Sequence, residues 1–356
     1  MPLKSLKLNW LLVSLLIVLL SACGKNGEAV PPADGIAPPQ TAVPEENVPP
    51  EPAPPAYTAP LTGLPLEEPL TRRPVAIMIN NAPAARPQSG LIDADVVYEV
   101  LAEGGVTRLV SIFHSQADNA KIGPIRSIRP YMIDLGESYH GVLVHAGASN
   151  DAYAILQRQH KEDLDEITNA GSFFWRDKSR KAPHNLYSNV EKLLEGAAKR
   201  GYATEDGAVP AYAFYKDNEQ PHSFETANNV EITFQLDNYR VGYEYDAATG
   251  LYQRSINGAP HADLESGDRL TAANVVVMGA DHRVLDDVGR LEVGLSLGGE
   301  AVLFQKGKVI RGEWVRKEGD IIRFIKDNVE LPMVPGQTFI HVVPNTPDFA
   351  SHVKAE

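Results

Sequence analysis

The apolar run Val75-Ala76-Ile77-Met78-Ile79 decides the fold class of the first region, because a short, bounded run of this composition predicts a buried strand. A polar loop, residues 80–91, follows it directly. Two more β-rich runs, 108–113 and 141–145, are bounded by proline, glycine or polar residues. Segments of helical character lie between and after these runs. The first region of the chain is therefore predicted to be an α/β domain.

Three helices are predicted in this region, over residues 127–139, 151–159 and 188–200. Ser188 is placed to cap the last of them, Glu191 completes the capping pattern, and Gly201 ends the helix. Ser149 lacks the glycine pattern of a nucleophile turn, so we interpret it as the cap of the second helix.

The pattern of predicted secondary structure changes after Gly201. Strand-like segments follow at 230–236, 239–245, 251–256, 274–278, 301–304, 308–315, 321–325 and 339–343. Turn residues such as Asn257-Gly258 and Gly298-Gly299 separate them, which is typical of antiparallel strands. We expect an α/β N-terminal domain at 61–205 and a mostly antiparallel β domain at 220–345, either a sandwich or a partly closed barrel. The whole chain is then α+β.

The N-terminus has the features of a secretory signal at residues 1–22. Lys4 and Lys7 precede an apolar run from Trp10 to Leu20, which is too short to span the roughly 30 Å of a bilayer comfortably. The run ends in Leu20-Ser21-Ala22-Cys23, which looks like a bacterial lipobox. We therefore expect a lipid on Cys23 that holds the protein at the membrane outside the cytoplasm, in preference to a transmembrane anchor or an ordinary signal peptide.

A proline-rich segment, residues 23–60, follows the lipobox. Proline fixes φ and favours an extended chain, so this segment is predicted to be a disordered tether that reaches on the order of 100 Å when fully extended. A plain spacer is favoured over a proline-rich recognition motif.

Composition excludes several classes of chemistry. Cys23 is the single cysteine, so a lipid on it leaves no thiol for disulfides, iron-sulfur clusters, zinc binding or nucleophilic catalysis. The formal charge of −13 gives no basic stripe for nucleic acid. The pairs His261/Asp263 and Asp281/His282 lack a spaced third ligand. No metal, cofactor or nucleic acid is expected.

Polar strings in the first region carry the candidate binding residues, which are Arg86, Glu99, Glu103, Arg108, Arg126, Arg129, His184 and Asn185. Arg126 and Arg129 precede a predicted helix, where backbone N–H groups and the helix dipole favour an anion, and the two guanidinium groups could clamp a carboxylate or phosphate. In the alternative interpretation these arginines pair internally with acidic residues and only stabilise the fold.

Segment 94–108 bears on whether the protein is an enzyme. If it is helical, Glu99 and Glu103 lie four residues apart on one face. Together with His145 or His184 they could supply a general acid and base for hydrolysis of an envelope glycan or peptide. A binding role toward a polar or anionic cell-wall component, or toward a partner protein, is the favoured hypothesis. Hydrolysis and a purely structural role remain the alternatives.

Several of these strings resemble the YerB-like lipoprotein family, described as domain of unknown function 3048. The resemblance rests on residues 61–63, 85–90, 95–99, 103–108, 123–127 and 183–187. A separate similarity to the family's C-terminal domain covers 239–263 and 299–344. The resemblance implies an N-terminal and a C-terminal domain, and no established reaction comes with it.

Overall fold

The computed structural model describes residues 57–116, 120–216, 219–223 and 225–356. Cys23, the predicted signal 1–22 and most of the predicted tether 23–60 lie outside the described residues. The tether ends earlier than predicted, because β1 (Tyr57–Thr58) already pairs with β2 (Pro65–Leu66) and Ala59 is buried. The described residues belong to one compact unit.

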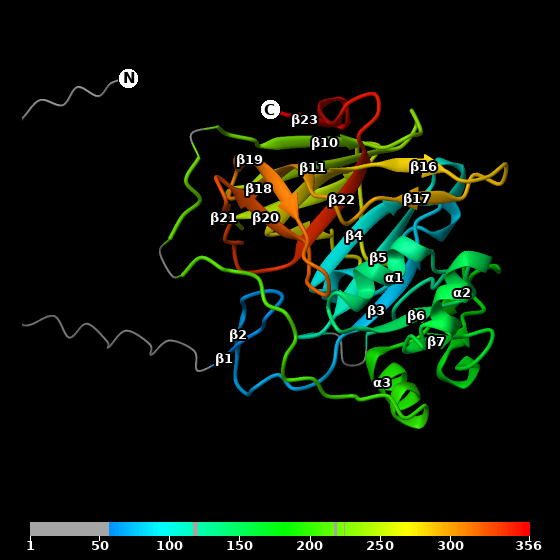
Figure 1. Ribbon diagram of the computed structural model, residues 1–356. Helices are drawn as coiled ribbons and strands as arrows, with labels where there is room; N and C mark the ends of the chain where they lie inside the picture. The colour runs from blue at the N-terminus through cyan, green and yellow to red at the C-terminus, as the bar shows by residue number, and fades with distance from the viewer. Residues whose placement is uncertain (1–56, 117–119, 217–218, 224) are drawn as a thin grey trace, which may run out of the picture. The chain divides into compact units, whose positions relative to one another are not determined.

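An eleven-stranded sheet is the centre of this unit (Figure 1). Its strand order is β21 (Val329–Glu330), β20 (Arg323–Lys326), β19 (Lys308–Val315), β18 (Gly299–Gln305), β15 (Asn274–Ala280), β22 (Thr338–Pro344), β4 (Val96–Leu101), β5 (Thr107–Phe113), β3 (Val75–Asn80), β6 (Val142–His145) and β7 (Asp163–Asp165). Strand β22 pairs in parallel with both β15 and β4. Strands from both predicted domains therefore share one hydrogen-bonded sheet.

A second sheet contains β13 (Ala259–Pro260), β12 (Leu251–Ile256), β11 (Arg240–Asp246), β10 (Asn229–Thr233) and β23 (Val353–Ala355), with β14 (Thr271–Ala272) also on β12. Two small hairpins are β8 (Trp175–Arg176) with β9 (Leu186–Tyr187), and β16 (His282–Val284) with β17 (Leu291–Val293). Most pairings after residue 220 are antiparallel, as predicted. The many mixed strands and few helices confirm the α+β class.

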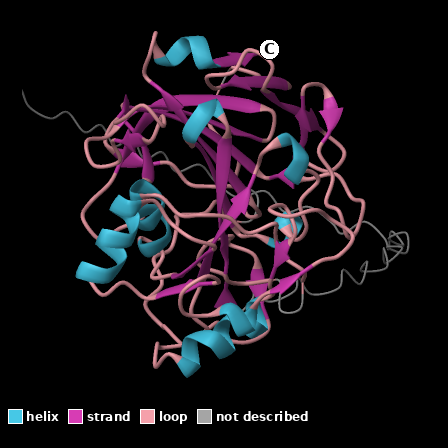
Figure 2. Ribbon diagram, turned by 90° about the vertical axis from the view of Figure 1, so that its right-hand side faces the viewer, coloured by secondary structure: helices cyan, strands magenta, loops and turns pink. Residues whose placement is uncertain are grey.

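The described residues form three short α-helices: α1 (Pro130–Glu137), α2 (Asn150–Arg158) and α3 (Val190–Lys199). The helical segments lie toward the outside of the strands (Figure 2). Ser149 caps α2 as predicted, because its hydroxyl accepts the Ala152 N–H. The predicted cap of α3 is wrong: Asn189 accepts the Lys192 N–H, while the buried Ser188 hydroxyl donates to the Phe173 carbonyl. None of the helices in these ranges has the length and apolar character to cross a membrane.

Single 3-10 turns connect several strands: η1 (Pro83–Ala85), η2 (Leu91–Asp93), η3 (Glu103–Gly105), η4 (Gly171–Phe173) and η5 (Phe349–His352). The helix considered over 94–108 is wrong, because this segment forms β4, η3 and β5. Every residue of β4 is buried. A strand covered on both faces shows no alternation of apolar and polar residues, so its sequence pattern does not separate it from a buried helix.

The eleven-stranded sheet is covered differently on its two faces. Helix α1 packs on one face, where a Cβ at Gly136 would lie 2.8 Å from the Ala76 Cβ. The second sheet covers the other face through side chains such as Arg254 and Tyr243. Strands β3, β4, β6 and β7 run in the same direction, so the loops after them meet at one edge. We call these loops, residues 81–90, 102–106, 146–149 and 166–170, the carboxyl edge.

Candidate functional site

Strand alternation places the predicted site residues on opposite faces of the sheet. Glu99 is paired across the ladder with His341 of β22, on the face that the second sheet covers. Arg108 is paired with Asn80 of β3, on the face that α1 covers. Glu103 lies beyond the end of β4, in η3. The structure therefore does not bring Glu99 and Glu103 together as a pair of catalytic carboxylates.

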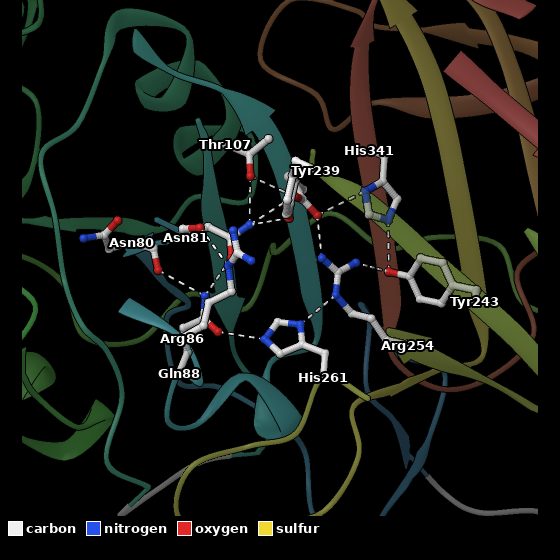
Figure 3. A network of polar contacts seen from close by, with 11 residues as sticks. Asn80, Asn81, Arg86, Gln88, Thr107, Tyr239, Tyr243, Arg254, His261 and His341 are labelled. Atoms are coloured by element: carbon white, nitrogen blue, oxygen red, sulfur yellow. Dashed lines mark hydrogen bonds and ion pairs between the residues drawn. The ribbon is translucent and has the colours of Figure 1, made fainter. Parts of the chain in front are cut away.

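Glu99 is fully buried and is the centre of a polar network. Figure 3 labels the surrounding members of this network, among them Thr107, Tyr239 and Arg254. Its Oε2 accepts a hydrogen bond of 2.6 Å from Arg254 Nη2. Its Oε1 accepts hydrogen bonds from Thr107 Oγ1 at 2.8 Å, Asn81 Nδ2 at 3.0 Å and the Tyr239 hydroxyl at 2.5 Å. Both carboxylate oxygens are thus satisfied by groups from both sheets.

Arg254 extends this network to three more side chains. Its Nη1 donates to the Tyr243 hydroxyl at 2.5 Å, and its Nε donates to His261 Nδ1 at 3.0 Å. Since His261 Nδ1 accepts, the ring proton is on Nε2, which donates to Gln88 Oε1 at 2.8 Å. Burial and the nearby Arg254 lower the pKa of His261 to about 3, so the ring is neutral.

The charge state of Glu99 follows from this environment. Burial by itself raises the pKa of Glu99, but Arg254, His341 and Tyr239 outweigh burial and hold the pKa well below its ordinary value. Glu99 and Arg254 are both fully buried, so the pair is a desolvated ion pair that joins the two sheets.

Arg86 belongs to the same network. Its guanidinium carbon lies 4.8 Å from the centre of the Tyr239 ring, and its Nε donates to the Asn81 carbonyl at 3.0 Å (Figure 3). The predicted residue His145 lies elsewhere: it is fully buried at the end of β6, with Nδ1 3.0 Å from the Gly147 carbonyl and Nε2 3.4 Å from Asp163 Oδ2.

Arg108, Arg126 and Arg129 lie together at the carboxyl edge, and we call these three residues the arginine cluster. Arg129 forms a two-point contact with Glu103, of which the Nη2–Oε2 bond is 2.8 Å. Arg108 is 8% exposed and donates from Nη1 to the Ser127 carbonyl at 2.7 Å. Its buried Nε has no hydrogen-bond partner among the described residues.

Arg126 differs from its neighbours in its side-chain contacts. Its backbone N–H donates to the Met78 carbonyl and its carbonyl accepts the Ala146 N–H, which fixes it across the ends of β3 and β6. Its half-buried side chain forms no hydrogen bond or ion pair with any residue in the described ranges. Burial and the charges of Arg129 and Arg176 lower its pKa, and the nearby carboxylate of Glu103 offsets only part of this lowering.

His184 adds a neutral donor beside Arg126. Asn80 Oδ1 accepts the Ala82 N–H at 3.0 Å, so Asn80 Nδ2 faces His184 Nδ1 at 2.8 Å and donates to it. The ring proton of His184 is therefore on Nε2. Burial, Arg126 and Arg180 lower the pKa of His184, which favours the neutral ring.

Asn185 is buried next to His184 and orients a further arginine. Its Oδ1 accepts a hydrogen bond of 3.1 Å from Arg176 Nη1, while Arg176 Nη2 lies 3.1 Å from Glu166 Oε1. The described residues contain no group of three His, Cys, Asp or Glu side chains arranged to hold a metal ion. The donors around Arg126 are N–H groups, and their arrangement suits an oxyanion.

Arg176 was not predicted from the sequence, and neither were the later residues of the Glu99 network. Three of these contact Glu99 directly, namely Tyr239, Arg254 and His341. The fourth, Tyr243, bonds to Arg254 and His341. The resemblance offered a signal for three of them, because Tyr239, Tyr243 and Arg254 lie inside the segment 239–263 that is similar to the family's C-terminal domain. His341 lies inside the similar segment 299–344.

Comparisons with known proteins agree with this architecture. Residues 61–203 match the N-terminal domain of the protein family of unknown function DUF3048, and residues 230–340 match its C-terminal domain. The chain is 38% identical to "Putative lipoprotein YerB" of Bacillus subtilis (strain 168) over 301 residues, which is 84% of this chain and 89% of the relative. It also matches the crystal structure of YerB protein from Bacillus subtilis with a TM-score of 0.76 and 35% identity, over 84% of this chain and 99% of that chain. The chain therefore belongs to the DUF3048 family.

Proposed function

We propose that this protein is a membrane-anchored envelope lipoprotein that binds an anionic group, a phosphate or a carboxylate, at the arginine cluster. The observation that carries the proposal is the half-buried guanidinium of Arg126, which lies near Arg129 and His184 and has no hydrogen bond or ion pair with any described residue. The ligand is an anionic component of the cell wall or an acidic segment of an envelope protein.

Charge and desolvation support a ligand at this position. A guanidinium that is partly withdrawn from water loses solvation, and a neighbouring arginine adds repulsion. An oxyanion removes both costs, because it supplies negative charge and accepts N–H hydrogen bonds from Arg126 and from His184 Nε2. The positive end of the α1 dipole, directly after Arg129, favours an anion in the same region.

The anchor is supported by the sequence and by the relative. Cys23 ends a run that looks like a lipobox, and the relative from Bacillus subtilis is named a lipoprotein. Lipid attachment at Cys23 places the folded unit outside the cytoplasm, where wall polymers and envelope proteins are the available partners.

The surroundings of the two glutamates favour binding over hydrolysis. Burial raises the pKa of Glu103, but Arg129 outweighs it, so the pKa is lowered, as it is for Glu99. A general acid for glycoside hydrolysis needs a raised pKa near neutrality. The purely structural interpretation describes the Glu99 network well, but it does not account for Arg126, whose side chain has no hydrogen bond or ion pair with any described residue.

Calorimetric titration of the full chain in detergent tests the proposal, with inorganic phosphate and citrate as probes at low ionic strength. We expect Arg126→Ala to weaken binding of the preferred probe by roughly 10- to 100-fold, which corresponds to one lost charge-assisted contact of about 1.5–3 kcal/mol. Arg126→Lys should retain part of the affinity, since it keeps the charge without the two-pronged geometry. The matched control is Arg283→Ala, in an exposed ion pair with Glu292.

Two kinds of result would contradict the proposal. One is a failure of the expected binding, either a wild-type chain that binds neither probe or an Arg126→Ala chain that binds as tightly as wild type. The other is turnover of wall fragments by a chain that does not bind them stably, with Glu103→Gln abolishing turnover and leaving affinity intact, which would favour the hydrolase.

A further inference from the structure

Five arginines lie at or beside the carboxyl edge, and we call them the arginine row: Arg86, Arg126, Arg129, Arg176 and Arg180. Arg129 and Arg176 lie close enough to Arg126 to lower its pKa. Arg180 lies close enough to His184 to lower the pKa of that histidine. It also donates to the carbonyl oxygens of Ala84, Arg86 and Pro87. Arg180 therefore ties the loop between β8 and β9 to the loop after β3.

The arginine row carries more positive charge than the carboxylates that pair with it can neutralise. In the described part, its members form ion pairs with two carboxylates, Glu103 on Arg129 and Glu166 on Arg176. Arg180 donates hydrogen bonds to backbone carbonyls, and Arg86 contacts one backbone carbonyl and the Tyr239 ring. Among the described residues, the side chain of Arg126 has no such partner. Counted over the row and these two partners alone, five positive charges face two negative charges, an excess of three, in a chain whose formal charge is −13. A singly charged ligand would leave most of this excess unmatched.

Two exposed lysines continue the positive charge beyond the row. Lys178 and Lys181 flank Arg180 in the loop between β8 and β9. Neither lysine forms an ion pair with another described residue. They extend the positively charged surface from the half-buried Arg126 out to solvent, as expected for a ligand that is longer than one anionic group.

We infer that the ligand of the arginine row is a linear polymer with repeated phosphate groups, of which one phosphate contacts Arg126 and the next ones contact Arg176 and the lysines. The inference rests on the proposed function and adds the class and valence of the ligand. Tetrahedral phosphate suits a position where donors approach from Arg126, His184 and Arg176, because it offers more acceptor oxygens than a planar carboxylate.

A chain of polyol phosphates fits better than a nucleic acid. Single-stranded nucleic acids bind through bases stacked on exposed aromatic rings beside a cationic groove. Tyr57 is the one aromatic among the exposed large apolar side chains of the described residues, and it lies in the small sheet of β1 and β2. The Tyr239 ring is already covered by Arg86.

The test compares four probes on the full chain: inorganic phosphate, a poly(glycerol phosphate), polyglutamate and an oligothymidylate of matched charge. We expect the glycerol phosphate polymer to bind at least about tenfold more tightly than phosphate. Its log affinity should fall against log salt with a slope of about −2 to −3, as three contacted phosphates require. Lys178→Gln/Lys181→Gln should weaken polymer binding by about two- to tenfold and leave phosphate binding unchanged. The control is Lys317→Gln/Lys326→Gln, exposed lysines at the other end of the strand order.

The outcomes separate this inference from the proposed function. Polymer binding no tighter than phosphate, or a slope near −1, would overturn the polymer and leave the anion site standing. Equal affinity for polyglutamate or for the oligothymidylate would overturn the assignment to a base-free phosphate chain. Failure of phosphate, citrate and polymer alike would overturn both.

Discussion

Glu99 and Arg126 are charged side chains of the same edge region with opposite surroundings. Glu99 has no exposed surface and receives hydrogen bonds from Arg254, Thr107, Asn81 and Tyr239, so its charge is fully matched inside the protein. Arg126 is half-buried, and within the described ranges its guanidinium has no partner. A matched buried charge belongs to the fold, whereas an unmatched one at the edge of a sheet is available to a ligand.

Replacing Glu99 by Gln should destabilise the protein strongly, because it leaves the fully buried Arg254 without its counter-ion. We expect a loss of about 3–5 kcal/mol in the free energy of unfolding, measured by urea denaturation. The matched control Glu292→Gln breaks the exposed pair with Arg283 and should cost at most about 1 kcal/mol. Equal effects of the two substitutions would show that the Glu99 network contributes little to stability.

At the scale of elements, the sequence predicts strands well where a β-rich run has clear boundaries, as at 75–79 and 251–256. It predicts the three α-helices within a few residues. The segment 94–108 resisted prediction because β4 is buried on both faces and its glutamate is satisfied by strands far along the chain. Arg126 and Arg129 were recognisable from their place before a helix, whereas the pairing of Glu99 with Arg254 depends on a register that no local pattern encodes.

Gly123 should be a sensitive position, because it holds the segment that carries Arg126. Its φ is +152°, and an added Cβ would lie 2.6 Å from the Leu186 carbonyl oxygen. Gly123→Ala should cost roughly 2–4 kcal/mol in the free energy of unfolding and also weaken phosphate binding. Gly104→Ala is the control: its φ is +69° with no atom within 4 Å, so it should cost only about 1 kcal/mol. A smaller effect at Gly123 than at Gly104 would contradict this account of the segment.

At the scale of the whole molecule, the strand β22 and the Glu99–Arg254 pair join the two regions that the family models match. The two regions are recognisable from the sequence because their predicted helix and strand contents differ. Their shared sheet is not recognisable, because a parallel pairing between residues 96–100 and 338–342 is a long-range contact with no signature at either end.

Because the two regions share one sheet and a buried ion pair, we expect the described unit to unfold in one cooperative step. Trp175 in β8 and Trp314 in β19 report on the two regions separately, in chains that retain one tryptophan each. Urea transitions followed by the fluorescence of the two tryptophans should coincide. Two separated midpoints would mean that the regions unfold independently and that the shared sheet couples them weakly.

The claim at the centre of this account is that Arg126 contacts an anion, and the arginine Nε–H resonances of the ¹⁵N-labelled protein test it most directly. Titration with inorganic phosphate should shift the Arg126 Nε–H signal, assigned by its absence in Arg126→Lys, and should leave the Arg254 signal in place. A shift confined to arginines outside the arginine row, or no shift at saturating phosphate, would contradict the anion site.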